Sequence, residues 1–171
     1  MQGDINELER IQKSFTNKIQ GMEDLDYHQR LKELKLYSLE RRRERYLIIY
    51  AWQMIEGIKE NYLGLKVSKY GRNRSIQSHP IRWSYNGKKI KHSTRSLLYK
   101  STGKKMERLF NCLPPKLGNI EGKITITFKT QLDKWLRNVP DTPKFDNYGA
   151  RVGAESNSIT HQVVAQCLRQ L

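Results

Sequence analysis

The residues best suited to chemistry form a run of basic side chains interleaved with aromatic ones, between Lys66 and Arg95. Cations neutralise phosphates and release their counterions, and aromatic rings stack on unpaired bases for roughly 1–3 kcal/mol each. We therefore predict a nucleic-acid-binding surface; the alternative is a solvated loop whose aromatic side chains pin it to the core. The basic members are Lys66, Lys69, Arg72, Arg74, Arg82, Lys88, Lys89, Lys91 and Arg95, and the aromatic members are Tyr70, Trp83 and Tyr85.

The net charge of +15 is concentrated in the same part of the chain. Residues 65–118 hold 14 lysines and arginines against one acidic residue, Glu107, which gives a net charge of +13. The same count gives −1 for residues 1–36, +1 for residues 37–64 and +2 for residues 119–171. Such an excess implies an anionic partner, most commonly nucleic acid, with a membrane surface as the weaker alternative.

A second basic cluster, RRRER at residues 41–45, is interrupted by a glutamate. On a helical wheel, Arg41 and Arg45 fall on the charged side together with the neighbouring glutamates. Arg42 and Arg43 flank an apolar stripe, on which they can lay their stems while their heads point outward. We therefore expect only Arg42 and Arg43 to contact phosphate, and we expect the cluster to be a weak nuclear localisation signal.

No arrangement of residues suited to catalysis is recognisable. The sequence has no phosphate-binding glycine motif, no HExxH and no paired-carboxylate motif. The four histidines are far apart, and Cys112 and Cys167 form no CxxC pair, which indicates reduced thiols in an intracellular protein. The clustered acids of a two-metal polymerase or nuclease are missing from the basic segment. We expect no catalytic residue, metal site, cofactor or small-molecule substrate.

Length and composition set limits on the fold. A chain of 171 residues can bury a core in one domain or two small ones. It is 37% hydrophobic and 29% charged, which suggests an open, elongated structure or a piece of something larger. No apolar run approaches the roughly 20 residues needed to cross a bilayer, and the opening MQGDINELER is too polar for a signal peptide. We expect an intracellular protein, nuclear or cytoplasmic, that is not secreted and does not bind a membrane.

Helical periodicity is strongest in residues 1–62, for which we predict a small helical bundle. Residues 4–20 form an amphipathic helix, and residues 26–34 form a short second one. The first helix is expected to bury the apolar face formed by Ile5, Leu8, Ile11, Phe15 and Ile19.

The third helix lies between an N-cap at Ser38 and a stop at Gly57. It is apolar nearly all round from Leu47 to Ile55, which is typical of a helix buried on every side. This predicts either the central helix of a bundle or a helix that docks on a missing domain.

Residues 63–118 form a second predicted region, in which helical periodicity disappears as far as residue 105. Ile81, Trp83 and Tyr85 alternate, Asn86-Gly87 fits a type I′ turn, and Ile90 lies beyond it, so we predict a basic β-hairpin or loop. MERLFNCL at residues 106–113 is expected to be a short apolar helix or turn.

Residues 119–171 form the third predicted region, with one strong helix, a linker and a weak helix at 157–169. The strong helix is capped by Thr125 or Thr127 and carries Phe128, Leu132 and Leu136 four residues apart. The three regions together predict a mainly α protein.

Several segments of the sequence, taken in their order along the chain, resemble those of a known protein family. They are LERIQKSFTNKIQGM, YHQRLKELKLYSLERRRERYLIIYAWQMIEG, RLFNCLPPKLGNI, FKTQLDKWLRNVPDTP and NYGARVGAESNSI. They are similar to the region that follows the polymerase core in jockey-like non-LTR retrotransposon reverse transcriptases and to the C-terminal tail of those proteins. The match covers most of the chain, and its specificity lies in the combination, because none of the segments is catalytic.

The resemblance implies that residues 1–62 are the thumb, which holds the template–primer duplex, and that residues 63–171 are the C-terminal extension. The family is an RNA-directed DNA polymerase that uses palm aspartates and Mg²⁺. This sequence has no Asp-Asp pair, so no palm residue is carried over. The implied function is a nucleic-acid-binding C-terminal fragment, inactive alone, whose further partner is the missing polymerase core. Two other hypotheses remain: a helical module whose third helix docks a protein partner, and a non-functional retroelement remnant.

Overall fold

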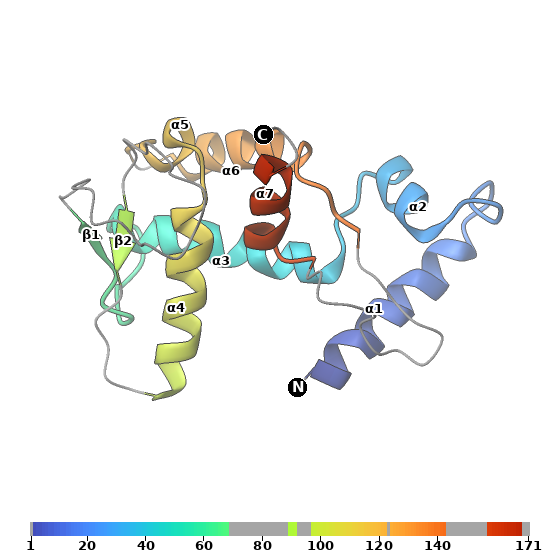
Figure 1. Ribbon diagram of the computed structural model, residues 1–171, viewed down its shortest axis with the longest axis horizontal. Coiled ribbons are helices and arrows are strands. Elements are labelled where there is room, and N and C mark those ends of the chain that lie inside the picture. The colour runs from blue at the N-terminus through green and yellow to red at the C-terminus, as the bar shows by residue number, and fades with distance from the viewer. Residues whose placement is uncertain (1, 69–88, 92–96, 123, 143–156, 169–171) are drawn as a thin grey trace.

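The computed structural model describes residues 2–68, 89–91, 97–122, 124–142 and 157–168, and these are mainly helical, as predicted (Figure 1). Two short strands pair in an antiparallel ribbon. The helices are α1 (Gln2–Asn17), α2 (Tyr27–Glu33), α3 (Leu39–Ile55), α4 (Leu97–Asn111), α5 (Pro115–Gly118), α6 (Thr125–Leu136) and α7 (Ile159–Leu168), and the strands are β1 (Lys66–Ser68) and β2 (Lys89–Lys91).

Local sequence features set the ends of the second and third helices. The Asp26 carboxylate accepts hydrogen bonds from the backbone N–H groups of His28 and Gln29, and the Gln29 side-chain oxygen accepts one from the Asp26 N–H, which makes a capping box. Ser38 caps α3 through the Arg41 N–H, as predicted. Gly57 follows α3 with a φ of 71°, a conformation that glycine adopts without strain.

Helix α3 is the central helix of the molecule, and α4, α6 and α7 pack around its apolar half (Figure 1). Trp52 of α3 is almost fully buried and stacks on Phe128 of α6, with ring centroids 4.6 Å apart and planes 5° apart. Its indole N–H donates to the Ile120 carbonyl at 3.0 Å, so the polar atom of this large side chain is also satisfied. Other parts of the chain cover most of this half, but Leu47, Tyr50 and Ile55 remain half-buried, so α3 is a central helix that is not buried on every side.

The core contains residues from all three predicted regions. Trp52 comes from residues 1–62, Phe110 from 63–118 and Phe128 from 119–171, and each is at most 1% exposed. The segments are therefore joined by one apolar cluster that α3 organises.

Helix α4 is longer than predicted. Helical periodicity was expected to be absent as far as residue 105, but α4 begins at Leu97. Gly103 disfavours a helix by about 1 kcal/mol, yet it lies buried, and the burial of Met106, Leu109 and Phe110 against the core outweighs that cost.

The strand β2 contains Ile90, but its described partner is not the one expected. It pairs antiparallel with β1, with Val67 opposite Ile90. The other arm and the turn of the predicted hairpin, residues 81–87, lie outside the described residues. A pairing between segments some twenty residues apart leaves no local turn pattern to detect.

The middle of the apolar face predicted for α1 is exposed, contrary to prediction. Leu8, Ile11 and Phe15 are 50%, 64% and 69% exposed, whereas the buried side chains are Glu9 and Thr16. Of the other two predicted members, Ile19 lies beyond the end of α1 and is half-buried, and the side chain of Ile5 lies outside the described part of the structure. Glu9 explains the orientation: it accepts from the Tyr27 hydroxyl at 2.6 Å and from the Leu39 N–H at 2.9 Å. These bonds turn the polar side of α1 toward α2 and the start of α3.

Candidate nucleic-acid interface

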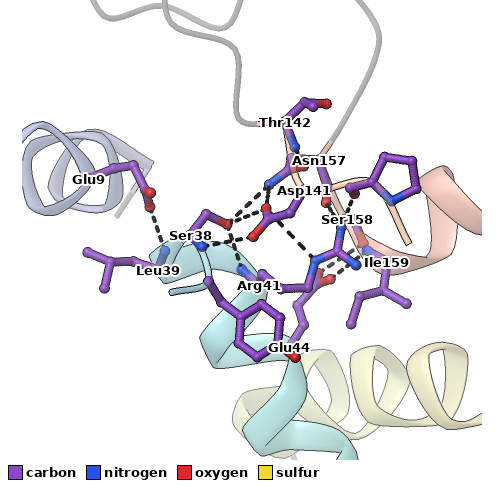
Figure 2. Close-up of polar contacts among 12 residues, drawn as sticks. Glu9, Ser38, Leu39, Arg41, Glu44, Asp141, Thr142, Asn157, Ser158 and Ile159 are labelled. Carbon is purple, nitrogen blue, oxygen red and sulfur yellow. Dashed lines mark hydrogen bonds and ion pairs between the residues drawn. The ribbon is translucent and has the colours of Figure 1, made fainter. Parts of the chain in front are cut away.

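The structure separates the four arginines of residues 41–45. Arg41 was expected on the charged, outward side of α3, but its side chain is fully buried, and so is that of Glu44 (Figure 2). Residues 140–141 and 157–159 pack against α3 here, so the charged side of the helix lies inside the protein.

Arg41 bridges the first turn of α3 and the chain on either side of residues 143–156. One guanidinium nitrogen, Nη2, donates to the carbonyls of Pro140 and Asn157, and Nε lies 3.9 Å from the Asp141 carboxylate. Burial lowers the pKa of Arg41, and the nearby carboxylates of Asp141 and Glu44 oppose that shift.

Glu44 is the cap of α7. Its carboxylate accepts from the Ser158 hydroxyl at 2.9 Å and from the Ile159 N–H at 2.7 Å, at the helix end that favours an anion. Lys105 of α4 lies 3.3 Å from the same carboxylate. Glu44 therefore joins three helices.

Asp141 makes the corresponding contacts at the start of α3. Its carboxylate accepts from the Ser38 N–H and hydroxyl at 2.8 and 2.7 Å, and from the Asn157 amide at 2.7 Å (Figure 2). We call the set Ser38, Arg41, Glu44, Asp141 and Asn157 the polar junction. Its carboxylates are already bonded to protein donors, so its evident role is to tie α7 and residues 141–142 to α3.

The other arginines lie outside the junction. Arg42 is exposed and Arg43 is half-buried, in keeping with the prediction that they face outward. Arg45 instead forms a two-bond ion pair with Asp133 of α6, at 2.6 and 2.7 Å, and this hydrogen bonding raises its pKa. Arg42 is thus the most accessible cation of the cluster.

Two tyrosines of α3, Tyr46 and Tyr50, continue the line of Arg42 along the helix. The sequence reasoning missed this row. Arg42, Tyr46 and Tyr50 are spaced four residues apart and so lie along one side of the helix. Tyr46 is 58% exposed, and the hydroxyls of Tyr50 and Tyr62 share a hydrogen bond at 2.5 Å. Tyr62 is 51% exposed. The four-residue spacing was visible in the sequence, but Tyr46 was assigned to the apolar stripe of the first half of the helix and Tyr50 to the half that was expected to be buried all round.

The β1–β2 ribbon brings together three lysine positions of the predicted site. Lys66 is opposite Lys91 and Ser68 is opposite Lys89. The register therefore places Lys66, Lys89 and Lys91 at neighbouring positions of the ribbon. Lys66 is exposed, and it lies four residues after Tyr62. The remaining predicted site residues, Lys69, Arg72, Arg74, Arg82, Trp83, Lys88 and Arg95, lie outside the described residues, as do Tyr70 and Tyr85.

Across the described residues, no group of three or more histidine, cysteine, aspartate or glutamate side chains could hold a metal ion. None of the helices in the same ranges has the length and apolar character that crossing a membrane requires.

Comparison with known proteins gives no match. No protein family, no curated protein and no solved structure matches the chain.

Proposed function

We propose that this chain binds nucleic acid through a surface made of the basic segment 65–118 and the exposed side of α3. The observation that carries the proposal is the net charge of +13 in residues 65–118, which contain 14 lysines and arginines and one acidic residue. A polyanion is the partner that such a one-sided charge attracts most strongly, because each neutralised phosphate releases counterions.

The geometry suggests how the two parts of this surface divide the work. Lys66 and Lys91 are paired in the β1–β2 ribbon, Lys89 lies two positions from Lys91, and these lysines can neutralise phosphates. Tyr46 and Tyr62 expose about half of their surface and can stack on bases beside Arg42. In this proposal the chain is the thumb and C-terminal extension of a jockey-like non-LTR reverse transcriptase, and it holds the template–primer without catalysing a reaction itself.

The first experiment is a binding titration with a labelled RNA–DNA template–primer across a salt series from 50 to 200 mM. If the lysines contact phosphates, affinity falls steeply with salt, and the variant with Lys66, Lys89 and Lys91 changed to Glu shows a logarithmic salt slope smaller by about 2–3. Binding that ignores salt, or no binding, would refute the proposal.

The control variant carries the same change of charge elsewhere. Lys32 of α2 and Lys134 of α6 are exposed, and so is Arg137 just after α6; changing all three to Glu should leave the salt slope close to that of the parent. An equal loss in both variants would show that net charge alone, and not the ribbon, governs binding. The same preparation should not extend the primer with Mg²⁺ present, and measured extension would contradict the non-catalytic part of the proposal.

A further inference from the structure

Three tyrosines, Tyr46, Tyr50 and Tyr62, form an aromatic surface on and beside α3, and we call them the tyrosine track. Tyr46 and Tyr62 are 58% and 51% exposed, and Tyr50 is half-buried. The rings of Tyr50 and Tyr62 have centroids 6.4 Å apart and planes tilted by 55°, an arrangement that aromatic pairs favour. Rings that are exposed and also held in place offer a platform on which bases can stack.

The Tyr46 ring is held in place by the arginine next to it. The Arg45 guanidinium carbon lies 5.8 Å from the centroid of the Tyr46 ring, within the range of a cation–π contact. Arg45 is itself fixed by its two bonds to the Asp133 carboxylate, at 2.6 and 2.7 Å. Tyr46 therefore keeps its orientation while more than half of its surface stays open to solvent.

Tyr62 is held in place by the turn that contains it. The side-chain amide of Asn61 donates to the Leu65 carbonyl at 2.6 Å, and its side-chain oxygen accepts from the Leu65 N–H at 2.9 Å. Leu63 and Leu65 are buried in the core, and the Tyr62 hydroxyl is bonded to that of Tyr50. These contacts fix the position of the second exposed ring relative to α3.

The spacing of the track favours unpaired bases over a duplex. Tyr46 and Tyr50 are four residues apart on α3, which separates them by a rise of about 6 Å along the helix axis. Successive bases of one strand in a duplex are only about 3.4 Å apart and already stack on each other, so a duplex offers a free base face only at its ends. An unpaired strand can spread its bases and lay them on separate rings.

Cations lie at both ends of the track. Arg42 precedes Tyr46 by one helical turn, and Lys66 follows Tyr62 by four residues. Both side chains are exposed, and neither forms an ion pair with another described residue. Both are therefore available for the phosphates of a strand whose bases lie on the rings.

We propose that the tyrosine track binds an unpaired strand of nucleic acid, whose bases stack on Tyr46 and Tyr62 and whose phosphates contact Arg42 and Lys66. In a template–primer, this strand is the unpaired overhang of the template. The inference rests on the proposed function and deepens it, because it names the class of nucleic acid that the exposed side of α3 recognises.

Binding titrations with three labelled probes test this choice of partner. The probes are a single strand, a blunt RNA–DNA duplex, and the same duplex with an unpaired template overhang. Tyr46→Ala and Tyr62→Ala should each bind the single strand about 5–150-fold more weakly than the parent, the equivalent of the roughly 1–3 kcal/mol that one stacked base contributes. Both variants should bind the blunt duplex like the parent.

The matched control is Phe15→Ala, which also removes an exposed ring. Phe15 is 69% exposed, but it lies on α1 and outside the track, so this variant should bind all three probes like the parent. Tyrosine variants that lose affinity for the blunt duplex and the single strand alike would overturn the inference. So would a parent chain that binds the blunt duplex and not the single strand, and this result would leave the proposed function intact. Absence of salt-dependent binding to any probe would refute the proposed function and the inference with it.

Conservative variants separate stacking from a purely structural role of the tyrosines. Tyr46→Phe and Tyr62→Phe keep the ring and remove the hydroxyl, and Tyr62→Phe also loses the bond to Tyr50. Both should bind the single strand like the parent, and thermal unfolding should show that all four tyrosine variants keep the fold. If Tyr62→Phe binds the single strand as poorly as Tyr62→Ala, binding depends on the hydroxyl and not on the ring, and the stacking model is wrong.

Discussion

Helix α1 and the second half of α3 are rich in large apolar side chains, yet they use them in opposite ways. From Ile48 to Met54, α3 buries its apolar residues against α4, α6 and α7. Helix α1 turns Glu9 and Thr16 inward and leaves Leu8, Ile11 and Phe15 outside. The difference lies in what faces each helix: an apolar cluster faces α3, and the donors of Tyr27, Leu39 and Arg30 face α1.

The contrast shows that periodicity finds an apolar face but does not show whether the chain supplies its cover. Loss of the bonds from Tyr27 and Leu39 would leave the buried Glu9 carboxylate unpaired and would destabilise the fold strongly. Those bonds therefore outweigh the gain from burying Leu8, Ile11 and Phe15.

The largest expected effect comes from one substitution made in both regions. Phe128→Ala removes a fully buried ring that stacks on Trp52, and it should lower the free energy of unfolding by about 3–5 kcal/mol. Phe15→Ala removes a ring that is 69% exposed and should change it by less than about 0.5 kcal/mol. Urea unfolding measures both free-energy changes. Equal losses would mean that α1 is covered within the monomer.

Neighbouring arginines give the next largest contrast. Arg41→Gln leaves the Pro140 and Asn157 carbonyls and the Asp141 carboxylate without their cationic partner, and it should cost about 2–3 kcal/mol. Arg42→Gln alters an exposed side chain and should leave stability almost unchanged while weakening nucleic-acid binding. Thermal unfolding and the binding titration separate the two effects. The division of the cluster fails if Arg42→Gln destabilises the fold as much as Arg41→Gln does.

Much of the fold could be predicted because local rules decide it. The predicted cap at Ser38 and the predicted stop at Gly57 depend on residues a few positions apart, and the structure has both. The predicted cap of α6 at Thr125 or Thr127 is wrong, because the helix begins at Thr125 and Ile124 before it has no side-chain oxygen to accept a bond. The buried row Phe128, Leu132 and Leu136 follows directly from its spacing. The predicted α7 region also contains a helix, Ile159–Leu168.

The parts that could not be predicted depend on contacts far apart in the sequence. Arg41 was predicted to lie outside because a helical wheel considers one helix alone. In the structure Pro140, Asp141 and Asn157, which are about a hundred residues away in the sequence, enclose its side chain. The pairing of Lys66 with Lys91 has the same origin. For the candidate site, charge counting identified the segment, but the exposed Tyr46 and Tyr62 emerged only once α3 was seen to leave one side uncovered.

The smallest effect tests the polar side of α1 directly, through pH. Burial raises the pKa of Glu9 above its ordinary value, and the hydrogen bonds from Tyr27 and Leu39 offset this only in part. A raised pKa in the folded state means that protonation favours folding. The contribution of Glu9 is therefore fully present below the unfolded pKa and is lost as the pH rises through the folded pKa.

The measurement is the unfolding free energy of the parent minus that of Glu9→Gln, followed from acid to neutral pH. This difference should fall as the pH rises, because the variant cannot ionise at position 9, while Glu33→Gln in α2 controls for the loss of an exposed carboxylate. A difference that rises with pH would show that the bonds from Tyr27 and Leu39 outweigh the cost of burying the charge. In that case the inward polar side of α1 would stabilise the fold on its own. The exposure of Leu8, Ile11 and Phe15 would then follow from favourable contacts of Glu9 and not from a balance between those contacts and the cost of burying its charge.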